Sequence, residues 1–163
     1  MKKIIILLAL AMPLLASAQK FGHINTQELF AQMPEIKDVE SRLDSLNKQY
    51  ENLLSAMQEE YQKKLSDYQS KQATMTDAIR QITEEEIISL QQRIQTTYQT
   101  AQQDVQKKQS EWLAPIHERM AKAIQVVGEK EGYTYIFDTA AAAYVGKDAL
   151  DTMASVKKEL GIK

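Results

Sequence analysis

The two histidines are the side chains of this sequence best suited to acid–base or metal chemistry near neutral pH. His23 follows Gly22, and His117 stands next to Glu118. A general base or a metal site needs further partners at fixed spacing, and the sequence places none around either histidine. The chain also has no cysteine, no glycine-rich phosphate loop and no serine elbow. We therefore predict a protein that is not an enzyme, with no catalytic residue, no metal site and no cofactor.

The longest run of like charges is Glu84, Glu85 and Glu86, which follows Thr83. A threonine with a glutamate three residues later is the pattern of a helix capping box. Acidic side chains are favourable in the first turn because they face the positive end of the helix dipole. We therefore interpret this cluster as the start of a helix and not as a cation site.

Two apolar stripes predict two long helices. From Glu35 to about Arg80 there is no glycine or proline, and apolar residues recur at steps of three and four, with one additional step of four near Tyr61. A connection of two to four residues to the next helix makes the pair antiparallel. The first stripe comprises Ile36, Val39, Leu43, Leu46, Tyr50, Leu53, Met57, Tyr61, Leu65, Tyr68, Met75 and Ile79, and the second comprises Ile87, Leu90, Ile94, Tyr98, Ala101, Val105, Trp112, Ile116, Met120, Ala123 and Val127.

Pro115 lies inside the second stripe. It removes one backbone donor, and its ring clashes with the carbonyl group of Glu111. We expect a kink that serves as a hinge in the arm. The alternative is that a separate helix begins at Pro115.

The residues outside the two stripes carry strand signals. Phe21–Asn25 and Tyr133–Phe137 are short aromatic and β-branched runs, and Ala143–Val145 is a weaker third candidate. Two short helices complete this part: one is capped by Asn25 and ends at Pro34, and a last one opens at Asp148 with Asp151 and closes at Gly161.

The predicted fold class is mainly α, with a long antiparallel helical hairpin on a small β body and a C-terminal helix. Residues 1–18 form a signal peptide. Residues 19–34 and 131–163 form a β-rich oligomerisation body, and residues 35–130 form the hairpin arm, with its tip near residues 80–84.

The predicted body is too small to stand alone. It has about 49 residues and no disulfide, and domains below about 70 residues rarely bury enough apolar area by themselves. Its short sheet also leaves open edges that copies of the chain can close against one another. We expect a homo-oligomer joined through the residues Phe21, Ile24, Tyr133, Tyr135, Phe137, Tyr144 and Val145.

The first residues predict export. Lys2 and Lys3 precede an apolar run from Ile4 to Leu15, and Ala16–Ala18 is an A-x-A cleavage site. The apolar run is shorter than the roughly 20 residues that span a bilayer. Cleavage after Ala18 leaves 18 basic and 22 acidic side chains, and this balance disfavours nucleic-acid partners. The helices alternate both charge signs, so we expect membrane contact to be indirect at most.

Methionines, tyrosines and isoleucines become frequent toward the predicted tip. Flexible thioethers and amphipathic phenols repack against varied apolar partners, as a promiscuous binding surface requires. For each residue taken alone, a place in the hairpin seam is the simpler interpretation. As a set, we predict that they bind clients: Met57, Tyr61, Tyr68, Met75, Ile79, Ile82 and Ile87.

In this order of elements the chain resembles the Skp/OmpH family of periplasmic chaperones. The most specific part is the segment from Pro115 to Asp138, with Ala-Pro-Ile-His-Glu-Arg-Met-Ala-Lys-Ala-Ile followed by Gly-Tyr-Thr-Tyr-Ile-Phe-Asp. The resemblance implies a homotrimer whose three helical tentacles enclose a cavity. It also implies that this cavity holds unfolded outer-membrane proteins without ATP, in the periplasm.

One departure concerns charge, because members of that family are often strongly basic and this mature chain is acidic. The basic residues proposed to contact lipopolysaccharide have no convincing counterpart here, and that site is not carried over. The alternatives are a structural coiled-coil envelope protein, or a scaffold for one fixed partner.

Overall fold

The computed structural model describes residues 19–162, so the predicted signal peptide and its cleavage site after Ala18 lie outside the described residues. The chain divides into two compact units. We call residues 34–115 the arm, and residues 19–33 with 116–162 the body. The predicted boundary near residue 130 is therefore shifted, because residues 116–130 group with the body.

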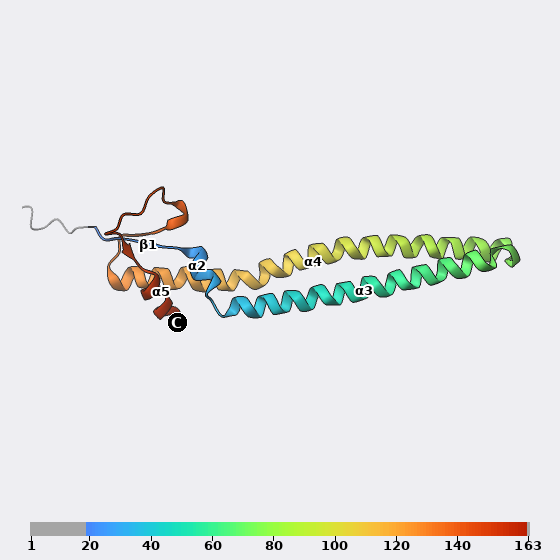
Figure 1. The fold of residues 1–163 in the computed structure, drawn as a ribbon, viewed down its shortest axis with the longest axis horizontal. Helices are drawn as coiled ribbons and strands as arrows, with labels where there is room; N and C mark the ends of the chain where they lie inside the picture. The colour runs from blue at the N-terminus through green and yellow to red at the C-terminus, as the bar shows by residue number, and fades with distance from the viewer. Residues whose placement is uncertain (1–18, 163) are drawn as a thin grey trace, which may run out of the picture. The chain divides into compact units, whose positions relative to one another are not determined.

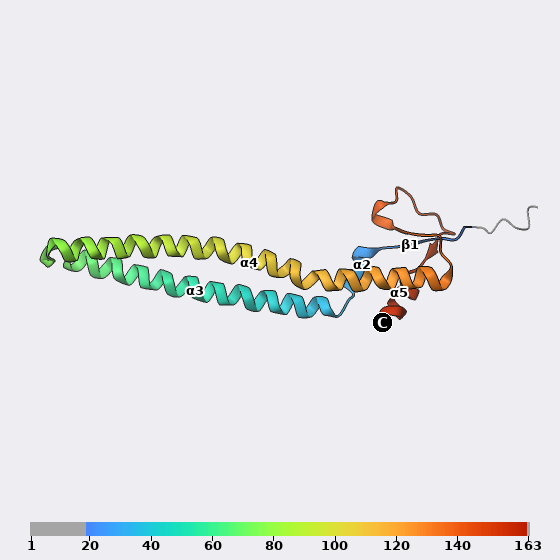
Figure 2. The same ribbon diagram turned by 180° about the vertical axis from the view of Figure 1, so that it is seen from behind.

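The arm is a pair of helices lying side by side (Figures 1 and 2). Helix α3 covers Glu35–Lys71, and helix α4 covers Asp77–Glu131, of which the part up to Pro115 belongs to the arm. Hydrogen bonds cross between the two helices at Tyr50 and Asp104 and at Tyr68 and Glu84. An antiparallel hairpin was predicted, and it is confirmed.

The predicted tip near residues 80–84 is wrong. The chain turns about eight residues earlier, through the 3₁₀ helix η2 (Gln72–Thr74) and an extended Met75. The hydroxyl group of Thr76 accepts a hydrogen bond of 3.4 Å from the amide of Ile79. Thr83 makes no cap, because its hydroxyl group donates to the carbonyl oxygen of Ile79 at 2.8 Å inside α4. The turn contains no glycine or proline, the residues that most strongly indicate a turn in a sequence, and it was therefore not predicted.

The predicted seam is confirmed at Val39, Met57, Ile87, Leu90 and Ala101, which are buried in the arm. It is wrong at three other positions. Leu53 is 47% exposed, and Leu54 takes the inward place, so the step of four falls between Tyr50 and Leu54. Tyr98 and Ile79 are 54% and 52% exposed.

Helix α4 continues through Pro115 without interruption. The alternative of a separate helix starting at Pro115 is therefore wrong. The boundary between the two compact units also falls between Pro115 and Ile116. The kink itself stays a prediction.

The body is built on a three-stranded parallel sheet in the order β2-β1-β3. Strand β1 (Phe21–Ile24) pairs with β2 (Tyr135–Asp138) and with β3 (Leu150–Asp151). The first two strands were predicted. The third was misplaced: Ala143–Val145 is irregular, and β3 lies in a stretch that was assigned to the last helix.

Short helices complete the body: α2 (Thr26–Ala31), η3 (Thr139–Ala141) and α5 (Met153–Leu160). The predicted cap of α2 is confirmed, since the side chain of Asn25 accepts a hydrogen bond from the amide of Glu28 at 3.0 Å. Gly161 ends α5 with a positive φ of 72°, a conformation that favours glycine.

The core of the body lies between the sheet and its helices. Thr152 is fully buried, and both its amide and its hydroxyl group donate to the carbonyl oxygen of His23. A Cβ atom on Gly22 would lie 2.8 Å from side-chain atoms of Thr152 and Tyr133, so only glycine fits this crossing without movement. The buried apolar side chains are Ile24, Leu29, Met33, Val156 and Leu160, with Ile116, Met120, Ala123 and Val127 of α4.

Candidate functional surfaces

The two histidines lie in structural surroundings. His23 is on β1, and its Nδ1 atom is buried with no hydrogen-bond partner among residues 19–162. His117 stacks on Phe30, with 4.3 Å between ring centroids. Within the same described range, no group of three or more His, Asp or Glu side chains is placed to hold a metal ion. The geometry therefore offers neither histidine a catalytic partner.

The glutamate cluster fastens the arm together instead of starting a helix. Glu86 forms an ion pair with Lys64 of α3 at 2.7 Å, and Glu84 accepts the hydroxyl hydrogen of Tyr68. The hydrogen bond to Glu84 raises the pKa of Tyr68, and the bond to Glu86 raises the pKa of Lys64. Glu85 accepts from the side chain of Gln81 in the preceding turn. Two of the three carboxylates thus link α4 to α3.

The predicted client-binding residues do not form one surface. Met57 and Ile87 are each 8% exposed in the seam between α3 and α4, so they cannot meet a client while the arm is closed. Ile79 and Ile82 are more than half exposed. The prediction does not hold for the first pair and remains open for the second. The half-buried members of the set are Tyr61, Tyr68 and Met75.

One face of the sheet in the body is aromatic and open. Phe21 and Tyr135 are paired in register and stack with 6.0 Å between centroids, and Tyr135 stacks on Phe137 at 5.8 Å. All three side chains are about half exposed. We call Phe21, Tyr135 and Phe137 the aromatic face. Beside it, the loop with Tyr144 and Val145 borders a hollow of about 550 Å³.

Two residues of the predicted oligomerisation set lie elsewhere. Ile24 is 1% exposed, so it belongs to the core of a single chain and is not available to a partner. The ring of Tyr133 is half-buried, with the ammonium group of Lys20 3.9 Å above it. Tyr144 is 83% exposed and Val145 38%, so both are accessible on the adjoining loop.

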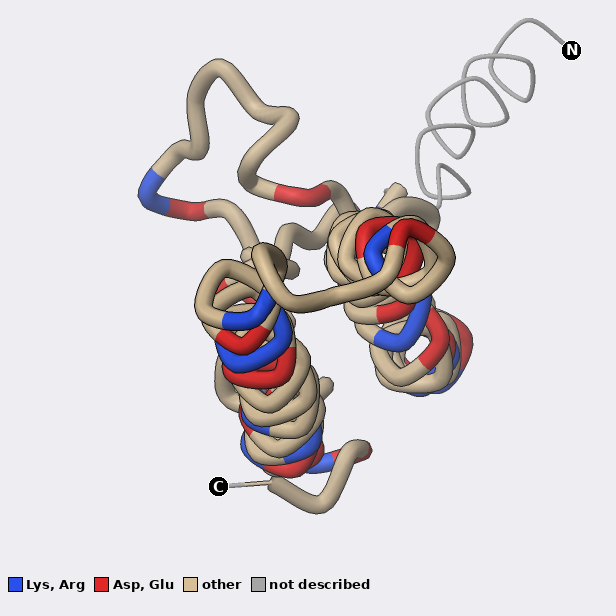
Figure 3. Tube along the Cα trace, turned by 90° about the vertical axis from the view of Figure 1, so that its right-hand side faces the viewer, with Lys and Arg blue, Asp and Glu red and all other residues tan. Residues whose placement is uncertain are grey.

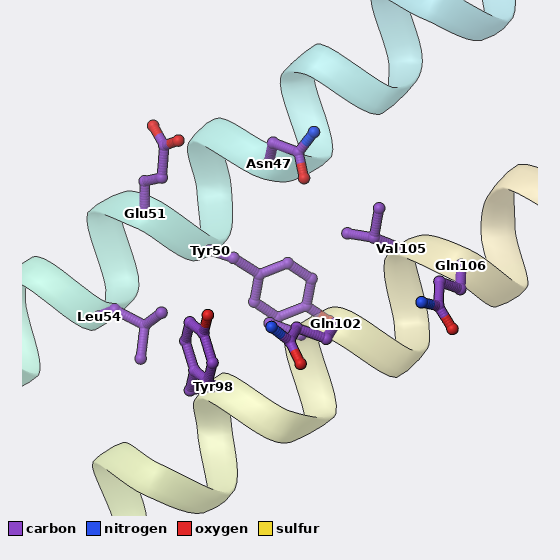
Figure 4. A pocket seen from close by; sticks show the side chains of 9 residues that line it. Asn47, Tyr50, Glu51, Leu54, Tyr98, Gln102, Val105 and Gln106 are labelled. Carbon is purple, nitrogen blue, oxygen red and sulfur yellow. The ribbon is translucent and has the colours of Figure 1, made fainter.

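Sequence reasoning missed a groove along one edge of the arm. Two hollows of about 420 and 580 Å³ share Leu54 and Tyr98 in their linings. Figure 4 shows Tyr50 pointing from α3 toward α4, and its hydroxyl group donates to Asp104 at 3.0 Å, which raises the pKa of Tyr50. We call these hollows the amide groove: Tyr50, Leu54, Ile94, Tyr98, Ala101 and Val105 form its floor, and Asn47, Gln58, Gln91, Gln95, Gln102 and Gln106 form its rim.

A signal for the groove exists in the sequence. The glutamines at 91, 95, 102 and 106 follow the helical repeat beside the apolar stripe, so they share one side of α4. Acidic and basic residues are interspersed along the helices (Figure 3), yet Glu51 is the one charged residue that lines the groove.

The comparisons with known proteins identify the family. A sequence model described as "Outer membrane protein (OmpH-like)" matches residues 20–160. The chain belongs to the OmpH-like family. The Skp chaperone of Pectobacterium atrosepticum is 30% identical over 144 residues, covering 88% of this chain and 87% of the relative. The Skp chaperone of Yersinia enterocolitica is 29% identical over 153 residues, covering 94% and 93%.

A solved structure of an OmpH-like outer membrane chaperone from Caulobacter crescentus has the same fold. Its TM-score is 0.77 at 15% identity, and the match covers 88% of this chain and 85% of that one. These similarities confirm the predicted family and the predicted mainly helical fold with a small β body. OmpH-like proteins of this kind are chaperones and not enzymes. Within residues 19–162, no helix has the length and apolarity needed to cross a membrane.

Proposed function

We propose that this OmpH-like chaperone is an ATP-independent holdase that binds unfolded outer-membrane proteins and prevents their aggregation. The observation that carries the proposal is the arm itself, where large apolar side chains remain exposed on a charged hairpin. Ile79, Ile82, Ile88 and Tyr98 are each more than half exposed. Such scattered apolar groups favour many weak contacts with a flexible partner over one tight pocket.

We place this activity in the periplasm. The support is the predicted signal peptide, with cleavage after Ala18, and the resemblance to periplasmic chaperones. The expected partners are unfolded outer-membrane proteins and further copies of the chain. Nucleic acid is not expected as a partner, and membrane contact is indirect at most.

The proposed assembly is a homotrimer joined through the body. The aromatic face supports this, because three large rings at about half exposure lie on the face of a short sheet. Aromatic clusters of this kind are typical of fixed interfaces. Copies joined there would present several arms to one client, which then lies in the cavity between the arms.

Pro115 is the proposed hinge of each arm. Replacing Pro115 with Ala restores a backbone donor in α4, so we expect a stiffer arm and a smaller client capacity. The distribution of distances between spin labels on the arm and the body, measured by pulsed electron paramagnetic resonance, should become narrower in the variant. An unchanged distribution together with unchanged capacity would remove the hinge from this proposal.

The decisive experiment is an aggregation assay. A urea-unfolded outer-membrane protein is diluted into buffer with and without the mature chain, and light scattering is followed with time. A holdase suppresses the scattering at a few-fold molar excess, without nucleotide. Unchanged aggregation would instead favour a structural coiled coil or a scaffold for one fixed partner.

A further inference from the structure

The amide groove combines an apolar floor with a rim of uncharged carboxamides. Tyr98 on the floor is 54% exposed, although its position in the stripe predicted burial in the seam. All six carboxamides of the rim are exposed, and none of them makes a hydrogen bond in the described part of the chain. Their donors and acceptors are therefore free to bind a ligand.

The opposite edge of the arm differs in its chemistry. At about 100° per residue, Glu86 and Arg93 lie on the other side of the buried stripe from Gln91 and Gln95. The hollow on that edge is lined by eight residues, of which five are charged: Glu60, Lys64, Glu85, Glu86 and Arg93. The carboxamide rim is thus a property of one edge of the arm, where Glu51 is the one charged lining residue.

A carboxamide has the same groups as a peptide bond, one carbonyl acceptor and N–H donors. An extended peptide presents unpaired N–H and C=O groups along its sides, whereas a helix satisfies its own. A rim of glutamines can therefore hydrogen-bond to the backbone of an extended chain, whereas a helical partner has few free backbone groups to bond. Because backbone groups are common to all sequences, such contacts do not depend on which side chains the client carries.

We propose that the amide groove binds an extended, apolar segment of an unfolded polypeptide, with rim carboxamides bonded to its backbone and floor side chains packed on its apolar residues. This inference rests on the proposed holdase function and names how one arm holds its client. Gln91 to Gln106 span about 22 Å at 1.5 Å per residue. At about 3.3 Å per residue, a strand of roughly seven residues fills that length.

The test uses the full mature chain and two fluorescein-labelled peptides. One is a nine-residue peptide of alternating apolar and serine residues without charged side chains, and the other is the same peptide with alternate backbone nitrogens methylated. Methylation removes backbone donors and keeps the side chains. Fluorescence anisotropy gives both dissociation constants, and we expect the methylated peptide to bind about five- to tenfold more weakly.

The informative variant is Gln95→Met with Gln102→Met, which removes two carboxamides at nearly constant size and helix propensity. We expect the ratio of the two dissociation constants to fall toward one. The matched control is Gln92→Met with Gln103→Met, two exposed glutamines on the side of α4 opposite the buried stripe that line neither hollow, where the ratio should stay as in the unmodified chain. Comparing ratios cancels any general gain in apolar attraction from methionine.

Three outcomes would contradict the proposal that the amide groove binds an extended peptide. The ratio can be near one in the unmodified chain, it can persist in Gln95→Met/Gln102→Met, or that variant can change the mass of the assembly, which would make the groove a contact between copies. The aggregation assay is read separately. If the chain suppresses aggregation but the ratio of dissociation constants is one, the holdase function stands and the groove proposal fails. If the ratio depends on the groove but aggregation is not suppressed, the groove binds peptide and the holdase proposal fails.

Discussion

The body and the arm bury their apolar side chains to different depths. In the body, a sheet and several helices enclose Ile24, Leu29 and Val156, which are 0–1% exposed. In the arm, only two helices meet, and the buried seam residues remain 3–8% exposed. Two helices cannot surround a side chain on all sides, so the body holds the tightly packed core and the arm has a thin one.

The two regions also differ in the apolar surface that they leave open. The body gathers three stacked rings on the aromatic face beside the loop with Tyr144, whereas the arm spreads its exposed apolar side chains along its length. A rigid, concentrated patch suits one fixed partner, and scattered groups suit many changing ones. Charge follows the same division: the arm has 14 acidic and 10 basic side chains, whereas the body has eight acidic and seven basic side chains.

The largest effect that we expect comes from breaking the aromatic face. Tyr135→Ser with Phe137→Ser removes two half-exposed rings from each copy. We expect the free energy of association to weaken by about 2–3 kcal/mol per copy in the assembly. We expect the assembly to dissociate to monomers at micromolar concentration, measured by sedimentation velocity. Helix content by circular dichroism should be retained.

The matched control for that variant lies in the arm. Ile79→Ser with Ile82→Ser removes comparably exposed side chains. It should leave the sedimenting mass unchanged and weaken the suppression of aggregation. If the arm variant dissociated the assembly and the body variant did not, the division of roles between the two regions would be wrong.

A pair of leucines tests the difference in packing depth. Leu29 is fully buried in the body, whereas Leu53 on the arm is 47% exposed. Leu29→Ala should lower the free energy of unfolding by about 2–5 kcal/mol, because it loses buried surface and leaves a cavity. Leu53→Ala should change it by less than about 0.5 kcal/mol. Urea unfolding followed by circular dichroism measures both, and equal losses would contradict the burial that separates them.

The regular parts of the fold were predictable because their signals are local. Heptad spacing predicted the hairpin and the burial of Val39 and Leu90. Asn25 and Gly161 bound their helices as a cap and a stop should. Each of these features depends on residues within one or two helical turns.

The parts that were missed depend on contacts between distant segments. The chain turns at Gln72–Thr74 without glycine or proline, while Thr83 resembles a cap but bonds back to Ile79 inside a helix. Strand β3 has only two residues, and its pairing with β1 defines it. For the amide groove, periodicity indicates only the row of glutamines on one side of α4. Its floor depends on packing, because both Leu53 and Leu54 fit an apolar stripe and only packing selects Leu54.

A smaller effect tests the polar links that hold the thin core of the arm together. Tyr50→Phe removes the hydroxyl group that donates to Asp104 and keeps the ring on the groove floor. We expect the thermal midpoint to fall by about 1–4 °C, with faster amide exchange in α3 and α4 near the substitution. The control is Tyr61→Phe on the same arm, where the ring is half-buried and its hydroxyl group makes no hydrogen bond within residues 19–162. A midpoint shift in this control would show that loss of a phenol alone explains the result.

The smallest effect that we expect is a loss of stability at low pH, which arises in the body at Asp138. The hydroxyl group of Thr26 donates to Asp138, the amide of Ala140 donates to the same carboxylate at 3.0 Å, and both bonds lower the pKa of Asp138. A lowered carboxyl pKa contributes stability above its ordinary value of about 3.9 and loses it as the pH falls through the folded value. Thr26→Val removes the larger cause, so its urea midpoint should fall less between pH 5 and pH 3 than that of the unmodified chain.

The hydrogen-bonded tyrosines of the arm make its stability fall at high pH, whereas Asp138 makes the stability of the body fall at low pH. The hydrogen bond to Asp104 raises the pKa of Tyr50, and the bond to Glu84 raises that of Tyr68. These links contribute stability below the ordinary tyrosine pKa of about 10 and lose it as the pH rises through the raised values. The pH dependence of stability at high pH distinguishes the arm from the body better than that at low pH. At low pH both regions lose stability, because Lys108 also lowers the pKa of Glu111 in the arm. Amide exchange near Tyr50 and Tyr68 should accelerate above pH 10 before exchange in β1 does, and simultaneous acceleration in both would show that the two regions open as one unit.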